Sequence, residues 1–272
     1  MTRLTAWTSA LVALIVLSPV AYGVGFAGAA YVTAEATSAQ EVARVSDQTP
    51  PNVVVITTDD MRADDLAGMP NTRRLLAGDN GARYINSWTS LPLCCPSRAT
   101  FLTGQTATHN GVWSNEGPHG GAPALNATNT LATWLQPTYR TVMLGKYLNL
   151  YGPDSMGLKP PAGWDHWAAL YGPRTYNYHR FDINVNGDLR AVEGYQTRDF
   201  TRRALRQLRA PGGQPTFMWL SLLAPHTELI AGDGPQVRAE PRYAGQSRVG
   251  LPDSPAVDER SIADKPDWMQ RP

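Results

Sequence analysis

The residues best suited to chemistry lie in one run, Cys94–Gly104, which reads Cys-Cys-Pro-Ser-Arg-Ala-Thr-Phe-Leu-Thr-Gly. Cys94 and Cys95 are the only cysteines in the chain, and adjacent cysteines are poorly placed for a disulfide because their Cα atoms lie too close together. Pro96 suits the first turn of a helix, where its missing N–H costs no hydrogen bond. The pattern predicts that Cys94 lies at or just before the amino end of a helix, a position that favours a bound anion. The alternative is that both cysteines are small apolar packing residues.

An acidic pair follows the first apolar segment of the chain. Residues Asn52–Thr58 are mainly β-branched and apolar on both faces, as in a parallel strand buried between two layers of helices. The segment ends in Asp59 and Asp60, whose carboxylate oxygens suit a hard divalent cation. The pair is therefore predicted to bind metal. Helix capping or solvated loop charge is the alternative, since Asp64 and Asp65 follow closely.

Two further apolar segments end near polar side chains. Arg140–Leu144 is expected to be a buried strand that leads to Lys146, and Thr216–Leu222 a strand that leads to His226. Alone, such a lysine is usually a solvated charge and such a histidine a loop residue. Open α/β sheets, however, collect their chemistry beyond the carboxyl ends of parallel strands.

Helical patterns lie between these strands. Pro70–Leu76 and Leu131–Leu135 are predicted to be short helices, and Gln196–Leu208 is an amphipathic one. Tyr84–Trp88 is expected to be extended. Strands that alternate with helices predict an α/β fold with a mostly parallel sheet flanked by helices. Residues 225–272 are rich in proline and predict no strand, so we expect the sheet to be incomplete on its C-terminal side.

The motif Cys94–Gly104 resembles the signature of the sulfatase family. Pro51–Asp60 is similar to that family's opening strand and first metal ligands, and Gly145–Asn149 and Ala224–His226 are similar to later blocks. The Gly-Lys-Tyr-Leu-Asn form of the second block resembles the glucosamine-6-sulfatase and extracellular heparan sulfatase branch. The resemblance implies an alkaline-phosphatase-like fold, of which this chain would be the amino-terminal part.

The resemblance also implies a nucleophile and a metal. In this family the first cysteine of the motif, here Cys94, is oxidised by a formylglycine-generating enzyme, and the hydrated aldehyde attacks sulfur. Asp59, Asp60 and the modified Cys94 would hold Ca²⁺, with Mg²⁺ as the alternative ion. Coordination to such a cation lowers the pKa of a hydroxyl group.

The same resemblance implies roles for three basic residues. Arg98 would hold the nucleophile and the metal-binding carboxylates through its planar guanidinium. Lys146 would neutralise a sulfate oxygen. His226 would bind sulfate or protonate the departing alcohol, which suits a group that titrates near neutral pH.

Two features depart from the family pattern. Simple arylsulfatases have a histidine where this chain has Leu148, and whether Asn149 takes over that role is open. No second metal-ligand pair and no further lysine matching the family follow His226. We therefore expect residues 231–272 to be the irregular tail of a truncated domain, and the chain alone could be inactive.

The net charge and the amino-terminal sequence indicate which partners the protein binds and where it is located. The formal charge of +1, from 24 basic and 23 acidic residues, predicts no general affinity for nucleic acid or acidic membranes. Residues 1–36 are predicted to be a signal peptide or a membrane anchor, 37–51 a linker, and 52–230 the catalytic region. The protein would then be secreted or held at the cell surface, touching membrane only through an uncleaved amino-terminal segment.

The predicted function is that of a sulfuric ester hydrolase that removes sulfate from a sulfated sugar or an aryl sulfate. One alternative is a phosphonate or phosphate monoester hydrolase of the same superfamily. Another is a fragment that binds sulfated glycans without cleaving them. A cluster of aromatic residues is expected to serve packing rather than sugar stacking; its members are Trp164, Trp167, Tyr171, Tyr176 and Tyr178.

Overall fold

A computed structural model describes residues 50–272 except 79–80, 231–233, 246–260, 262 and 267–272. The predicted signal or anchor (1–36) and nearly all of the predicted linker (37–51) lie outside the described residues. Within the described part of the chain, none of the helices combines the length and apolar character needed to cross a bilayer.

The chain divides into two compact units. Of the described residues, those within 50–59 and 89–237 form the first unit, and those within 60–88 and after 237 form the second. Residues 60–88 thus group with the C-terminal residues rather than with the rest of the predicted region 52–230. Such a grouping depends on contacts between segments far apart in the sequence, which local residue patterns do not encode.

The first unit is built on a six-stranded sheet with the order β1-β6-β2-β3-β4-β5. Strands β1, β6, β2 and β3 are parallel neighbours, whereas β4 and β5 are antiparallel. The mostly parallel α/β fold predicted from the sequence is confirmed. The strands of the sheet are β1 (Val53–Thr58), β2 (Arg140–Gly145), β3 (His166–Leu170), β4 (Arg180–Val185), β5 (Asp188–Glu193) and β6 (Thr216–Leu222).

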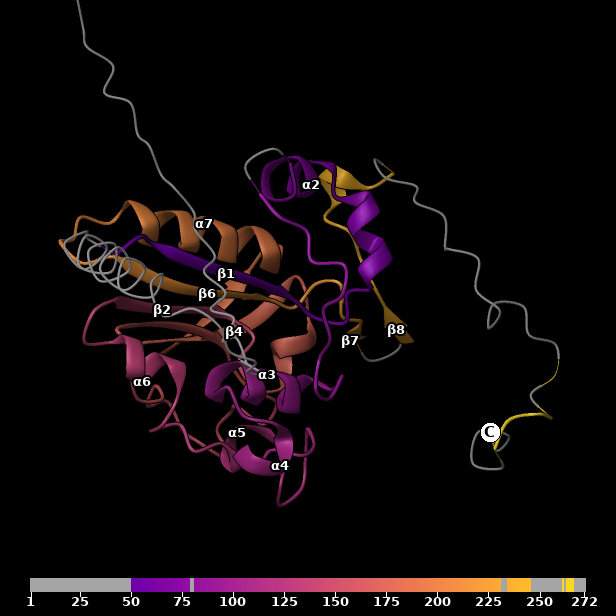
Figure 1. Cartoon of the computed structure of the whole chain (residues 1–272), viewed down its shortest axis with the longest axis horizontal. Coiled ribbons are helices and arrows are strands. Elements are labelled where there is room, and N and C mark those ends of the chain that lie inside the picture. The colour runs from indigo at the N-terminus through magenta and orange to yellow at the C-terminus, as the bar shows by residue number, and fades with distance from the viewer. Residues whose placement is uncertain (1–49, 79–80, 231–233, 246–260, 262, 267–272) are drawn as a thin grey trace, which may run out of the picture. The chain divides into compact units, whose positions relative to one another are not determined.

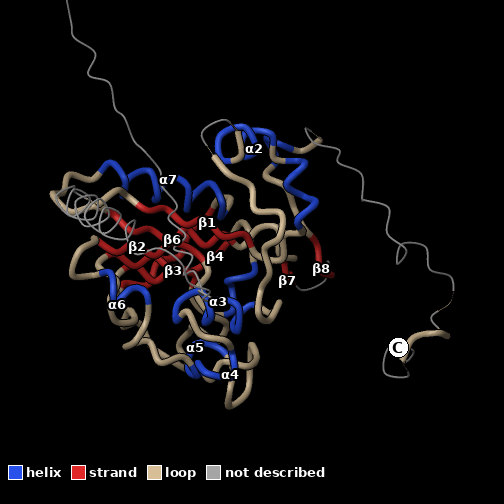
Figure 2. Tube along the Cα trace, in the orientation of Figure 1, coloured by secondary structure: helices blue, strands red, loops and turns tan. Residues whose placement is uncertain are grey.

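Helices lie on both faces of this sheet. Helix α7 covers one face, and α3 and α6 lie on the other with the short helices α4 and α5 beyond them (Figure 1). The helices of the first unit are α3 (Cys94–Thr103), α4 (Ala107–Asn110), α5 (Gly121–Ala124), α6 (Leu131–Leu135), α7 (Gln196–Arg209) and the 3₁₀ helix η2 (Pro173–Tyr176). Figure 2 shows the strands enclosed between these helical layers.

Each face of the sheet has its own apolar core. Met143 and Trp219 pack on the α3 side with Leu102, while Met218 packs on the α7 side with Phe200. Burial of each such side chain contributes roughly 1.5–3 kcal/mol. Because β2 and β6 lie in the middle of the sheet, both of their faces are covered, which explains why their sequences are apolar without alternation.

Some elements differ from the sequence-based expectation. No strand was expected after residue 225, but β7 (Glu228–Ile230) and β8 (Gly234–Gln236) form an antiparallel pair. Strands this short have too few residues to display a periodic pattern, and glycine and proline in the second one are typical of loops. Strands β3, β4 and β5 were also missed.

The second unit contains short helical elements. These are η1 (Ala63–Gly68), α2 (Pro70–Leu76) and η3 (Pro241–Tyr243). The bounds of α2 match the prediction. Tyr84–Trp88, which was expected to be extended, forms no strand and is exposed.

Candidate functional site

The carboxyl ends of the parallel strands meet at one edge of the sheet. Thr58 of β1 is paired with Leu222 of β6, and Gly145 of β2 is paired with Ser221 of β6. Residues that directly follow these strands are therefore brought together. Asp59 follows β1, Lys146 follows β2, and His226 lies in the loop after β6, so that three segments far apart in sequence contribute to one site.

Gly145 allows β2 and β6 to approach closely at this edge. Its φ is +103°, and a Cβ atom there would collide with the carbonyl oxygen of Ser221. The same carbonyl accepts a hydrogen bond from the N–H of Lys146 at 2.8 Å. Only glycine combines this backbone angle with this contact, and Lys146 is positioned as a result.

Helix α3 begins at Cys94, as predicted. The side chain of Cys94 is half-buried, whereas Cys95 is fully buried. The N–H of Cys95 donates to Oδ1 of Asn115 at 2.9 Å, and its Sγ accepts from the N–H of Asn149 at 3.0 Å. The amino end of the helix is therefore fixed from two other loops.

The two thiols consequently differ in reactivity. Burial raises the pKa of Cys95 to about 11, so this thiol stays protonated at neutral pH. Both cysteines are free thiols, in agreement with the expectation that they do not pair. Cys94 is the thiol that a modifying reagent or enzyme can reach.

Asp59 is buried and forms ion pairs with two basic side chains. Its Oδ1 accepts from Nη2 of Arg98 at 3.1 Å, and its Oδ2 lies 2.5 Å from Nζ of Lys146. Burial alone would raise the pKa of Asp59, but the charges of Arg98 and Lys146 outweigh it and hold the pKa below its ordinary value. Asp59 therefore stays ionised at neutral pH.

Arg98 connects the ends of three strands. Besides Asp59, its guanidinium donates through Nη1 to the backbone oxygen of Lys146 at 2.7 Å and to Oγ of Ser221 at 2.6 Å. It also lies 5.8 Å from the ring centre of Trp219. The planar fork of arginine suits this multiple donation, and Ser221 is a residue of the site that the sequence patterns did not indicate.

Lys146 is almost fully buried, and its ammonium also reaches Cys94. Nζ lies 3.6 Å from Sγ of Cys94. Burial would lower the pKa of Lys146, but the carboxylate of Asp59 raises it above its ordinary value. The ammonium is therefore charged and lies beside the predicted nucleophile.

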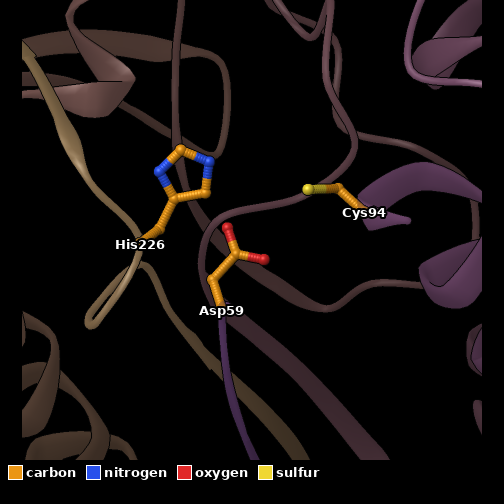
Figure 3. Close-up of side chains that lie close together, drawn as sticks. All are labelled: Asp59, Cys94 and His226. Carbon is orange, nitrogen blue, oxygen red and sulfur yellow. The ribbon is translucent and has the colours of Figure 1, made fainter. Parts of the chain in front are cut away.

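Asp59, Cys94 and His226 form a group that can hold a cation. One possible ligand atom from each lies within 4.8 Å of the others, and Figure 3 shows the three side chains converging on a common space. The spacing of these donor atoms therefore allows them to bind one cation. Nδ1 of His226 lies 2.7 Å from the carbonyl oxygen of Thr227. Because a carbonyl only accepts, Nδ1 carries the proton and Nε2 has the lone pair in the neutral ring.

The other predicted ligand, Asp60, is the first residue of the second unit. It is exposed and has a φ of +57°, a left-handed conformation that aspartate tolerates better than most residues. Its part in a metal site stays a prediction.

A cavity of about 660 Å³ adjoins the site. Its lining includes Lys146, Asn149, Tyr176 and His226 together with the acidic Glu116. Asn149 is a lining residue, and its amide, unlike the histidine of simple arylsulfatases, cannot act as an acid at neutral pH. The side chain of Leu148 is buried in the core on the α3 face.

The aromatic cluster serves mainly packing, with one exception. Trp167, Tyr171 and Tyr178 are buried in the two cores, as expected. Tyr176 packs partly buried against the core on the α7 face but also lines the cavity beside Lys146 and His226. Sequence reasoning missed this because η2, which carries Tyr176, follows the undetected strand β3.

Similarity to known proteins agrees with this geometry. The model of the sulfatase family matches residues 51–265. This chain belongs to the sulfatase family. A relative from Drosophila melanogaster, named extracellular sulfatase SULF-1 homolog, is 32% identical over 238 residues, which cover 81% of this chain and 20% of the relative. Human N-acetylglucosamine-6-sulfatase is 31% identical over 198 residues, 66% of this chain and 35% of that protein.

A solved structure in complex with its substrate, D-glucosamine-2-N,6-O-disulfate, superposes on this chain with a TM-score of 0.55 at 28% identity. The match covers 65% of this chain and 35% of that one. The chain thus spans about a third or less of the length of these sulfatases. The predicted membership in the sulfatase family, with relatives from the glucosamine-6-sulfatase and extracellular sulfatase branch, is confirmed.

Proposed function

We propose that this sulfatase chain carries the nucleophile and anion-binding half of a sulfuric ester hydrolase site, within the catalytic region 52–230. The observation that supports this most is the placement of Cys94. Cys94 is the first residue of α3, and its side chain is only half-buried. The charged side chains of Asp59 and Lys146 lie beside it. A nucleophile must lie beside positive charge to attack a sulfate ester, because the ester is itself an anion.

Each basic residue has a distinct proposed role. The Lys146 ammonium binds a sulfate oxygen and offsets the charge that develops during attack. Arg98 keeps Asp59 ionised and holds the ends of β1, β2 and β6 in register. His226 keeps its Nδ1 proton on the Thr227 carbonyl, and in the imidazolium form, which also carries a proton on Nε2, it gives that second proton to the departing alcohol.

The proposed nucleophile is the hydrated formylglycine made from Cys94. Oxidation replaces sulfur by oxygen, which turns the donors at this position into the hard ligands that calcium and magnesium prefer. Asp59 and the modified Cys94 would hold the cation, Asp60 being a further predicted ligand. When bound, the cation lowers the pKa of a hydroxyl beside it and so supplies a nucleophile at neutral pH.

The proposed substrate is a sulfated sugar of the glucosamine type. Two findings support it: a relative named N-acetylglucosamine-6-sulfatase, and the solved structure bound to a disulfated glucosamine. We also propose that the protein is exported. The extracellular name of the Drosophila melanogaster relative supports this, as does the apolar amino-terminal sequence.

Peptide mass spectrometry across Cys94 tests the nucleophile. In protein from its native host we expect formylglycine at Cys94 and an unmodified thiol at the buried Cys95. Cys94→Ala should lower the hydrolysis of an aryl sulfate on the order of 10⁶-fold, as loss of the covalent nucleophile does in a serine hydrolase. The matched variant Cys95→Ser should retain most of the activity. An unmodified Cys94 in active protein would contradict the proposal.

A second experiment separates the hydrolase from its alternatives. Turnover of an aryl sulfate and an aryl phosphonate is compared in the presence of calcium, with release of sulfate from N-acetylglucosamine-6-sulfate measured in parallel. We expect a preference for the sulfate ester. Faster turnover of the phosphonate would favour the phosphonate hydrolase, and retention of sulfated glycan without release of sulfate would favour a binding protein.

A further inference from the structure

Tyr176 contacts both basic side chains that face the cavity. Nζ of Lys146 lies 4.9 Å from the centre of the Tyr176 ring, and the ring centres of Tyr176 and His226 are also 4.9 Å apart, with an angle of 39° between their planes. We propose that Tyr176 is a positioning residue that holds Lys146 and His226 in place for an anionic ligand. This inference rests on the proposed function of the site. It adds to that site a residue from the segment that follows β3.

The Tyr176 ring can interact favourably with both the Lys146 ammonium and the His226 imidazole. The face of an aromatic ring attracts an ammonium within about 6 Å, and the attraction grows when both groups are removed from water. Lys146 is 1% exposed, so water does not compete for its charge. The contact with His226 restricts the imidazole, since two rings at this separation leave little room for rotation.

The backbone around Tyr176 is fixed by a buried side chain. Nε2 of Gln196, at the start of α7, donates to the carbonyl oxygens of Thr175 at 2.8 Å and Asn177 at 2.7 Å. These residues flank Tyr176 on both sides, and Gln196 is 2% exposed. A buried amide that binds both flanking carbonyls keeps the tyrosine from swinging away from the cavity.

The neighbouring Tyr178 shows that His226 is held in two different ways. The hydroxyl of Tyr178 donates to the backbone oxygen of His226, and its ring is buried in the core on the α7 face. Tyr178 therefore fixes the backbone at His226. Tyr176 acts instead on the imidazole ring, and it lines the cavity where Tyr178 does not appear.

The proposed role belongs to the ring, and the hydroxyl, which also interacts with Lys146, is tested separately. Tyr176→Phe keeps the aromatic face, while Tyr176→Leu replaces it with a smaller apolar side chain. Tyr139→Leu serves as a control, because Tyr139 precedes β2 at the opposite end of the strand from Lys146. All three variants are made in the full chain and compared in the presence of calcium.

Two measurements test the proposal. Binding of inorganic sulfate is measured by titration calorimetry, and the imidazole protons of His226 are followed by NMR, assigned through their loss in His226→Gln. We expect Tyr176→Leu to weaken sulfate binding about tenfold, because Lys146 and His226 would no longer be held in place before the anion binds. The ring-current shift of the His226 protons should disappear as well. Tyr176→Phe should restore both, with sulfate affinity within about threefold of the unsubstituted chain, and Tyr139→Leu should change neither.

Equal sulfate affinity with and without the ring would overturn the proposal, as would His226 resonances that stay in place in Tyr176→Leu. A Tyr176→Phe variant as weak as Tyr176→Leu would assign the effect to the hydroxyl and overturn it too. If the unsubstituted chain binds sulfate but does not hydrolyse sulfate esters, the proposed hydrolase function is wrong. The role of Tyr176 is still tested in that case, because it is measured by sulfate affinity.

Discussion

The parallel and the antiparallel parts of the sheet use charged residues in opposite ways. At the ends of β1 and β2, Asp59 is held by Arg98 and Lys146, and the side chains of all three are less than a tenth exposed. In the β4–β5 hairpin, Arg180 and Glu193 lie 3.8 Å apart with 74% and 84% of their side chains exposed. Buried ions that lose a partner are costly, whereas exposed pairs contribute little. Only the first group therefore constrains the fold and the site together.

The contrast has a cause in strand position. The parallel strands are covered by helices on both faces, so polar groups gather where these strands end. Strand β5 lies at an edge of the sheet and is largely exposed, so its charges sit along its length and serve solubility.

The largest effect is expected from removing the shared carboxylate. Asp59→Asn would leave Arg98 and Lys146 buried without their counter-charge, and the free energy of unfolding should fall by about 3–5 kcal/mol. Asp182→Asn in β4, which breaks the more exposed pair with Arg174, should cost about 1 kcal/mol or less. Urea denaturation of both variants measures the difference in the free energy of unfolding. Equal decreases would show that the charged groups of the parallel and antiparallel parts contribute equally to stability.

Two glycines with the same backbone angle provide a second test. Gly145 and Gly187 both have a φ of +103°, but an added Cβ collides with the Ser221 carbonyl only at Gly145 and makes an ordinary contact of 3.9 Å at Gly187. Both alanine variants share the strain of that angle. Gly145→Ala should therefore lose about 1–3 kcal/mol more than Gly187→Ala. Thermal denaturation gives the comparison, and similar losses would show that the strand ends can relax.

Acid should weaken the parallel part through Asp59. Its folded pKa is below the unfolded value near 3.8, so its stabilisation is complete above that value and is lost as pH falls through the folded pKa. The free energy of unfolding should decline there by up to about 1.4 kcal/mol per pH unit more than in Asp59→Asn. Urea titrations between about pH 6 and pH 3 measure both slopes. Parallel curves would mean that Asp59 has an ordinary pKa in the folded state.

The smallest effect is expected on the hairpin surface. Arg180→Ala should change the free energy of unfolding by no more than about 0.5 kcal/mol, because the pair with Glu193 is exposed and long. The same urea assay applies. A decrease in the free energy of unfolding above about 1 kcal/mol would show that this exposed ion pair stabilises the antiparallel part.

Prediction of the fold from sequence succeeded where apolar runs were continuous or where apolar residues recurred at helical spacing. Strands β2 and β6 and helices α2, α6 and α7 were found with bounds within one residue. Strands β4 and β5 were missed although Asn186-Gly187 between them is a strong hairpin signal, with both residues at positive φ. Strand β3 was obscured by surrounding aromatic residues, which suit strands and loop packing equally.

Prediction of the site depended on residues that follow detected strands or belong to a motif. The structure brings together five of the site residues that the sequence predicts: Asp59, Cys94, Arg98, Lys146 and His226. Their chemical roles stay predictions. Ser221, Asn115 and Tyr176 could not be found, because a buried serine, a loop asparagine and a tyrosine among other aromatics look the same in a sequence whether or not they face a site.

The sequence alone determined the family, the mostly parallel sheet and the identity of the candidate nucleophile, because these follow from a spaced motif and from local apolar runs. Tertiary structure decided which charges meet. The pairing of Asp59 with Lys146, the capping of α3 by Asn115 and the packing of Tyr176 on both basic groups join residues that lie far apart in the sequence. Such contacts arise only once the strands are in register, since burial and distance set the strength of an electrostatic interaction.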